Sequence, residues 1–134
     1  ARLTRSIRSS PRHYLILHFN RFVRKKKGWQ KDSTTLDLPL NLMIREGIQS
    51  EIVIKFKLLS IVEHQGQSMD SGHYISIIRR DIIYESDSSE EISTGYNWYW
   101  ISDDQVRCIR QNEKLSVMKG RQPYLAFYAR IDDQ

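Results

Sequence analysis

The clearest alternation of apolar and polar positions lies in residues 52–62, where Lys55 and Lys57 separate a series of apolar residues: Ile52, Ile54, Phe56 and Leu58. A period of two places the apolar residues on one face of a strand and the lysines on the other. This pattern predicts a half-buried β-strand. Residues 64–72 have the composition of a loop, and strand-forming residues resume at 73–80. The two segments are therefore expected to form a hairpin with a long connection.

Other segments rich in aliphatic and aromatic residues are also expected to be strands: 13–22, 34–42 (interrupted by Pro39), 97–102 and 123–131. Tyr14 and Phe19 are expected in the core. The segments between them are interpreted as a charged turn around Gly28, an acidic surface insertion at 81–95, and connecting structure at 103–122 with one helical turn at 113–118.

These elements predict an α+β fold with a mostly antiparallel β-sheet and little helix, whose helical layer would come from elsewhere. A chain of 134 residues is one domain or part of one. Residues 1–12 are expected to be a flexible basic leader, and residues 132–134 a short tail.

The net charge of +5 is unevenly distributed, because residues 1–31 contain ten basic side chains and no acidic one. Such a stretch can bind phosphate or an acidic surface. However, aromatic residues are not interleaved with the bases of 1–12, so nucleic-acid binding is not expected. No apolar run is long enough to span a membrane.

The single cysteine, Cys108, excludes an internal disulfide and a cysteine-based zinc site. It is expected to be a small, partly buried apolar residue in an intracellular, reducing environment. The four histidines have no familiar metal-ligand spacing, and we expect no metal and no other cofactor.

His73 is the candidate general base, because it follows Ser71 and Gly72 at the start of a predicted strand. Glycine lets a substrate approach the backbone closely, and a strand fixes the imidazole rigidly. A single histidine is more often structural, so the order of the surrounding segments decides its interpretation.

Four blocks occur in the order found in the ubiquitin-specific proteases, papain-like cysteine peptidases that cleave after the C-terminal glycine of ubiquitin. They are PRHYLILHFNRF, TTLDLPLNLMI, the histidine box FKLLSIVEHQGQSMDSGHYISIIRR, and NWYWISDDQV with the closing PYLAFYARI. One departure is that Leu-Asp-Leu precedes Pro39 here, whereas it follows the proline in the family. The chain resembles this family over residues 11–131.

The resemblance implies that residues 13–131 are the C-terminal, palm-like part of a papain-like catalytic domain. It implies that His73 is the catalytic base and that Gly72 and Tyr74 bind the Gly-Gly tail of ubiquitin in a narrow channel. Residues 65–71 would be a blocking loop that moves when ubiquitin docks. His64 lies beside this loop and is expected either to hold it or to contact substrate.

The resemblance implies that the third catalytic residue is either Ser102 or Asp103. Alignment on Trp98 and Val106 places Ser102 at the position that orients the histidine, and Asp103 next to it. Consecutive strand residues point to opposite faces, so both should not contact His73 unless the strand bends, and Ser102 is favoured. The segment WYWISDDQVR is similar to the mitochondrial outer-membrane branch of the family, which has a Cys-His-Ser triad.

The family's Gly-Asn-x-Cys nucleophile block does not occur in these residues. The resemblance therefore implies a cysteine-type deubiquitinase that needs the N-terminal half of its catalytic domain, so this chain alone is expected to be inactive. Its expected partners are ubiquitin and ubiquitinated proteins. The expected location is the cytoplasm, or the mitochondrial outer membrane if an upstream segment anchors the protein. The alternative is a catalytically inactive ubiquitin-binding or scaffold module of the same fold.

Overall fold

The computed structural model describes residues 12–47, 52–85, 92–110 and 119–132. Nine strands form there and no helix: β1 (Tyr14–His18), β2 (Phe22–Lys25), β3 (Gly28–Lys31), β4 (Asn41–Arg45), β5 (Val53–Gln65), β6 (His73–Glu85), β7 (Ile92–Ser102), β8 (Gln105–Ile109) and β9 (Pro123–Arg130). The prediction of a mostly antiparallel sheet with little helix is confirmed for these residues. None of them forms a helix with the length and apolar character needed to cross a bilayer.

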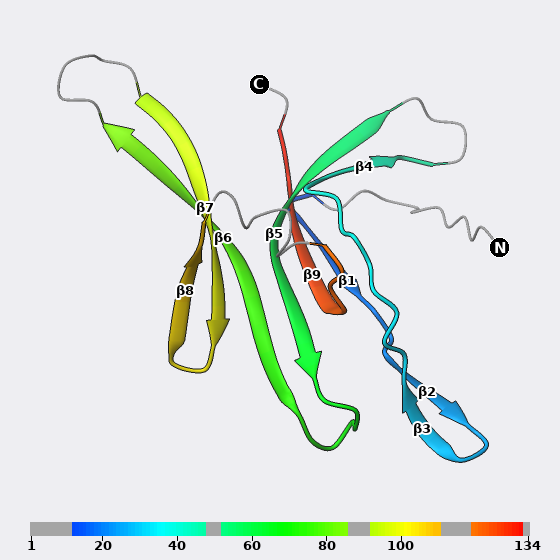
Figure 1. The fold of residues 1–134 in the computed structure, drawn as a ribbon. Coiled ribbons are helices and arrows are strands. Elements are labelled where there is room, and N and C mark those ends of the chain that lie inside the picture. Colours follow the sequence, from blue (N-terminus) through cyan, green and yellow to red (C-terminus); the bar gives the residue numbers. More distant parts are fainter. Residues whose placement is uncertain (1–11, 48–51, 86–91, 111–118, 133–134) are drawn as a thin grey trace.

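Strand β5 is the centre of the large sheet, whose order is β1-β9-β5-β6-β7-β8 (Figure 1). Strand β9 pairs with one edge of β5, while β4 and β6 share the other edge, β4 along Val53–Lys57 and β6 along Ser60–Gln65. All pairings are antiparallel. Strands β2 and β3 form a separate hairpin.

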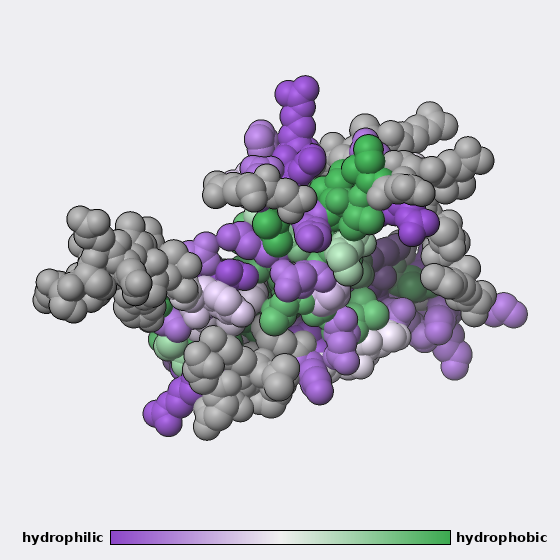
Figure 2. Space-filling model, turned by 90° about the horizontal axis from the view of Figure 1, so that it is seen from above, coloured by the Kyte–Doolittle hydropathy of each residue, from purple (hydrophilic) through white to green (hydrophobic). Residues whose placement is uncertain are grey.

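The predicted alternation in β5 is confirmed for Ile54, Phe56 and Leu58, which are 5%, 0% and 0% exposed. It is wrong for Ile52, which precedes the strand and is 60% exposed. The register of β5 against β9 shifts between Leu58 and Ser60, so the buried series continues at Ile61 rather than at residue 60. The other fully buried large side chains come from β6, β7, β8 and β9: Trp98, Tyr128, Ile77, Ile109 and Pro123. Apolar side chains also remain at the surface among hydrophilic ones (Figure 2).

The prediction of one strand over 13–22 is wrong, because β1 ends at His18 and β2 begins at Phe22. The prediction of Tyr14 as a core residue is also wrong, since its side chain is 66% exposed. Among the described strands, β1 pairs with β9 alone and buries the face of Leu15 and Leu17, so Tyr14 points to the opposite side. Phe19 packs partly buried against the core.

The charged segment around Gly28 is a turn as predicted, but the residues flanking it pair as β2 and β3. The strand expected at 34–42 is displaced, because regular pairing begins only with β4 at Asn41. Proline has no N–H for a ladder. Pro39 instead offers its carbonyl oxygen to the hydroxyl of buried Tyr128, at 2.9 Å. Residues 32–40 thus close the core instead of extending the sheet.

Strand β8 replaces part of the connecting structure expected at 103–122, and Cys108 on it is exposed rather than partly buried. The burial pattern of β8 has little alternation, since four of its five residues are exposed. Strands β6 and β7 also extend into the acidic segment 81–95, up to Glu85 and from Ile92. The helical turn expected at 113–118 and almost all of the leader lie outside the described residues.

Candidate active site

His73 and Ser102 are brought together by the pairing of β6 with β7. Ser76 lies opposite Ile101, so Ser102 and His73 are diagonal neighbours on the same face of the sheet. The imidazole Nε2 is 2.6 Å from the Ser102 hydroxyl oxygen, a hydrogen-bond distance. The His73 side chain is 39% exposed. One ring nitrogen is thereby engaged, while the ring remains accessible to a reactant.

Asp103 occupies the β7–β8 turn directly after Ser102, with a φ of 52°. Aspartate tolerates this left-handed conformation better than most residues. Its carboxylate oxygen is 3.8 Å from His73 Nε2, which is beyond hydrogen-bond distance but close enough for an electrostatic contribution. The strand therefore bends at its end, and the hydroxyl is the nearer group to the imidazole.

Gly72 is in a conformation that a side chain would disturb. Its φ is +139°, and a Cβ built on it would lie 2.4 Å from His64 Nε2 and 2.5 Å from the Gln65 carbonyl oxygen. These distances are much shorter than ordinary van der Waals contacts. Glycine therefore allows the chain to pass directly against His64 before it reaches His73.

His64 is buried, at 5% exposure, between two aromatic rings. Its ring centroid is 5.5 Å from that of Phe22 and 5.0 Å from that of Tyr74, both edge-to-face. Its Nδ1 atom has no hydrogen-bond partner among the described residues. The contacts are those of a packing residue at the base of the 65–72 connection.

Tyr74 lies opposite His64 in the β5–β6 ladder and follows His73 in the chain. Its ring is consequently on the other face of the sheet from the His73 imidazole. The side chain is 54% exposed and is 5.9 Å, centroid to centroid, from Tyr124, which contacts His18 in turn. The structure does not bring Tyr74 and the imidazole together, and it places Tyr74 in a row of aromatic rings instead.

Arg21, within the block PRHYLILHFNRF, is a buried residue at 4% exposure that organises the chain around it. Its Nε donates to the carbonyl oxygen of Pro123 at 2.9 Å, and its Nη1 to those of Asp32 and Thr34 at 3.3 and 2.5 Å. A planar guanidinium can donate in several directions at once. It ties the start of β9 to the segment after β3. A charged residue within an apolar run was the only signal in the sequence.

A second polar contact missed by sequence reasoning joins β5 to the start of β9. Glu63 is 8% exposed. Its carboxylate accepts hydrogen bonds from Arg121 Nη1 at 2.7 Å and from the Gln122 backbone N–H at 2.6 Å. A buried carboxylate needs such partners. This contact fixes the chain immediately before β9.

Cys108 does not face His73. It pairs with Tyr99, and Tyr99 and Ser102 differ by an odd number of positions along β7, so Cys108 lies on the other face of the sheet from Ser102. Among the residues that the structure describes, no group of three histidine, cysteine, aspartate or glutamate side chains could hold a metal ion.

The chain matches known proteins over most of its length. A profile described as ubiquitin carboxyl-terminal hydrolase matches residues 4–128. Ubiquitin carboxyl-terminal hydrolase 10 of Mus musculus is 31% identical over 128 residues, which cover 88% of this chain and 14% of that protein. The protein of the same name in Saccharomyces cerevisiae is 27% identical over 118 residues, which cover 87% of this chain and 13% of that protein. The chain thus spans a small part of the length of these relatives.

Solved structures share the fold. A structure of the yeast SAGA DUBm with an Sgf73 mutant matches with a TM-score of 0.65 and 27% identity, covering 90% of this chain and 25% of that chain. The SAGA Ubp8/Sgf11/Sus1/Sgf73 DUB module bound to ubiquitin aldehyde matches with a TM-score of 0.65 and 23% identity, with the same coverage. Because the profile spans nearly all of the described sheet, the chain belongs to the ubiquitin carboxyl-terminal hydrolase family.

Proposed function

We propose that this chain supplies the general base and part of the ubiquitin-tail channel of a cysteine-type deubiquitinase. The enzyme would hydrolyse the peptide or isopeptide bond after the C-terminal glycine of ubiquitin. The observation that carries the proposal is the 2.6 Å contact between His73 Nε2 and the Ser102 hydroxyl. The family match and the likeness to a DUB module bound to ubiquitin aldehyde support the substrate.

The contact supports Nδ1 as the nitrogen that acts as the base. When Nε2–H donates to the Ser102 hydroxyl oxygen, Nδ1 is unprotonated and can accept a proton. Nδ1 would take the proton of a cysteine thiol, and the thiolate would attack the carbonyl carbon of the terminal glycine. The resulting imidazolium would protonate the leaving lysine amine, and water would then hydrolyse the thioester.

The nucleophile in this proposal comes from outside the 134 residues. Cys108 is on the other face of the sheet from Ser102 and cannot serve without a rearrangement of β8. The N-terminal half of the catalytic domain would therefore be the essential partner, with its cysteine facing Nδ1. Gly72 and Tyr74 remain proposed contacts of the ubiquitin tail. His64 is proposed to support the loop of residues 65–71.

Ser102 and Asp103 have different proposed roles. The hydroxyl fixes the tautomer and orientation of His73, but it carries no charge to stabilise an imidazolium. The Asp103 carboxylate, 3.8 Å from Nε2, would supply negative charge from the turn. A Cys-His-Ser triad of this kind is what the similarity to the mitochondrial outer-membrane branch implies. We extend the proposal to a cytoplasmic location or, with an upstream anchor, to that membrane.

The test uses the complete protein that carries this segment and a fluorogenic amide at the C-terminus of ubiquitin. His73→Ala is expected to lower kcat by at least about 10²-fold, because general acid–base catalysis contributes that much. Ser102→Ala is expected to lower kcat about tenfold through loss of one hydrogen bond, and Asp103→Asn by less. Cys108→Ser is the control and should be as active as the unmodified protein.

Two outcomes would overturn parts of the proposal. An unchanged rate in Ser102→Ala with a large loss in Asp103→Asn would make the carboxylate the orienting group. Ubiquitin binding without hydrolysis by the unmodified protein would favour the alternative, an inactive ubiquitin-binding module.

A further inference from the structure

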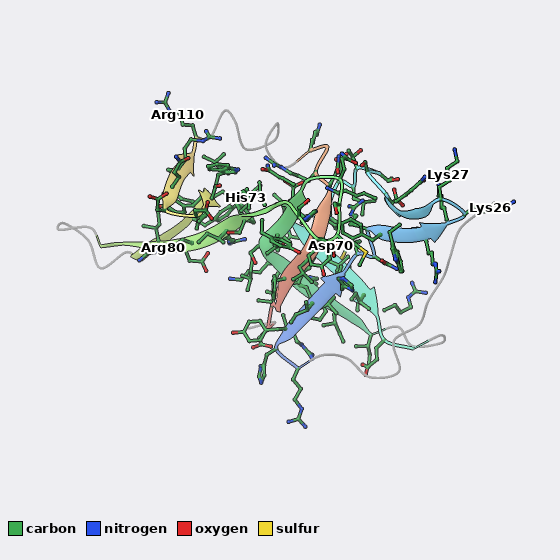
Figure 3. All side chains as sticks on the ribbon, turned by 90° about the horizontal axis from the view of Figure 1, so that it is seen from below. Lys26, Lys27, Asp70, His73, Arg80 and Arg110 are labelled. Carbon is green, nitrogen blue, oxygen red and sulfur yellow. The ribbon has the colours of Figure 1, made fainter. Side chains whose placement is uncertain are left out.

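Lys31, the last residue of β3, makes a contact that its position in the sequence does not suggest. Its Nζ donates hydrogen bonds to the backbone carbonyl oxygens of His64, at 2.6 Å, and Gly66, at 2.8 Å. The other lysines of the hairpin, Lys25, Lys26 and Lys27, are exposed. Figure 3 shows Lys26 and Lys27 at the outer end of the β2–β3 hairpin, far from His73. Lys31 alone among the lysines of the hairpin reaches the end of β5.

The two carbonyls lie at the end of β5 and at the start of the connection that leads to His73. A Cβ built on Gly66 would lie 3.1 Å from the Cα of Gly72, so the two ends of this connection are in contact. Gly72 in turn lies against the His64 ring and directly precedes His73. A group that fixes the backbone at 64–66 therefore also limits where the backbone of His73 can lie.

The surroundings of the Lys31 side chain disfavour its charged form. The contact is therefore more than an incidental one made by a surface lysine. Burial and the neighbouring guanidinium of Arg21 lower the pKa of Lys31, partly offset by the carboxylate of Glu63. Two carbonyl acceptors compensate for part of the lost hydration. The connection also borders a cavity of about 340 Å³, lined by Lys31, Gln65, Gly66 and Arg121 among others, so it has room to shift if it is released.

We propose that Lys31 is a positioning residue that holds the start of the 65–72 connection and, through the contact between Gly66 and Gly72, the backbone of His73. Its predicted effect on catalysis rests on the proposed function, in which His73 is the general base. We call the contact of Lys31 Nζ with the carbonyl oxygens of His64 and Gly66 the clamp. The clamp depends only on contacts within this chain, without ubiquitin.

The clamp is tested by backbone amide exchange, resolved by NMR, in the full chain. In Lys31→Met, which keeps the length of the side chain but donates no hydrogen bond, exchange at the end of the ladder (residues 63–65 and 73–75) is expected to be about tenfold faster, because charge-assisted hydrogen bonds are the strong ones. Lys26→Met removes an exposed lysine from the same hairpin and should leave exchange unchanged. Lys31→Arg, which keeps the charge and the donors, should recover part of the protection.

Equal protection in Lys31→Met and the unmodified chain would overturn the clamp. If Lys31→Met does not fold, Lys31→Gln, which keeps a neutral donor, replaces it in the same comparison. Faster exchange throughout the sheet, rather than at 63–65 and 73–75, would mean general destabilisation and would also overturn the proposal.

The catalytic consequence is measured in the complete protein with the fluorogenic ubiquitin amide. Lys31→Met should lower kcat several-fold, because His73 is less well placed, and should change KM less, with recovery in Lys31→Arg. The two proposals fail separately. Loss of protection without any hydrolysis by the unmodified protein would keep the clamp and reject the enzyme, whereas hydrolysis with unchanged exchange would do the reverse.

Discussion

Gly72→Ala should destabilise the chain for two reasons that can be separated. The first is conformational, because φ is +139° at this position and side chains rarely adopt it. Such backbone strain costs about 1–3 kcal/mol. The second is steric, because the new methyl group would lie 2.4 Å from His64 Nε2 and 2.5 Å from the Gln65 carbonyl oxygen. Overpacking of this kind costs about 1–3 kcal/mol.

Gly28→Ala provides the matched control. Gly28 also has a positive φ, +109°, but a Cβ there would meet nothing within 4 Å. It should therefore show the conformational cost alone. The difference in unfolding free energy between the two variants isolates the collision at Gly72, which we expect to be about 1–3 kcal/mol.

The assay is urea denaturation of the chain followed by tryptophan fluorescence. With a typical slope of about 2 kcal/mol per molar urea, the midpoint of Gly72→Ala should lie roughly 1 M below that of Gly28→Ala. When it is measured in a His64→Ala background, the cost of Gly72→Ala should be smaller than in the unmodified chain. Part of the cost should remain, because the Gln65 carbonyl oxygen is still in the way. Equal midpoints for the two alanine variants would refute the packing of Gly72 on His64.

Two further predictions concern buried polar groups. Burial raises the pKa of Tyr128 to about 12, from an ordinary value of 10.0. Between these pH values the folded chain keeps a proton that the unfolded chain releases, so stability should fall by about 1.4 kcal/mol per pH unit. Tyr128→Phe should remove this contribution, and an unchanged slope of urea midpoint against pH would contradict it. Arg121→Met leaves the Glu63 carboxylate with the Gln122 N–H and should cost about 3 kcal/mol. The double variant Arg121→Met with Glu63→Gln removes both charges, and it should lose less unfolding free energy than Arg121→Met alone. Urea denaturation measures both losses.

The sequence located most of the large sheet. Strands β5 and β9 were predicted because their apolar residues follow a strand pattern that survives in almost any tertiary setting. Strand β8 was missed, because it lies at the edge of the sheet and four of its five residues are exposed, so little alternation remains to be recognised. The same position at the edge explains why Cys108 is exposed.

The break between β1 and β2 could not be predicted from hydrophobicity. The segment 13–22 is rich in aliphatic and aromatic residues up to Phe22, but Arg21 turns inward to donate to carbonyls that lie 11, 13 and 102 residues away in the chain. Only the folded chain presents those acceptors together. The hydrogen bonds of Lys31 could not be predicted for the same reason, since its two carbonyl acceptors follow it by 33 and 35 residues in the chain.

For the candidate site, the sequence by itself indicated the family, singled out His73 as the candidate base, and narrowed its orienting partner to Ser102 or Asp103. It did so because motif order and the alternation of strand residues are local properties of the chain. The tertiary structure decided what is in reach of the imidazole: the hydroxyl at 2.6 Å and the carboxylate at 3.8 Å. It also decided that Cys108 lies on the other face of the sheet from His73. Those facts depend on the register between β6, β7 and β8, which is fixed by the packing of side chains from the whole sheet.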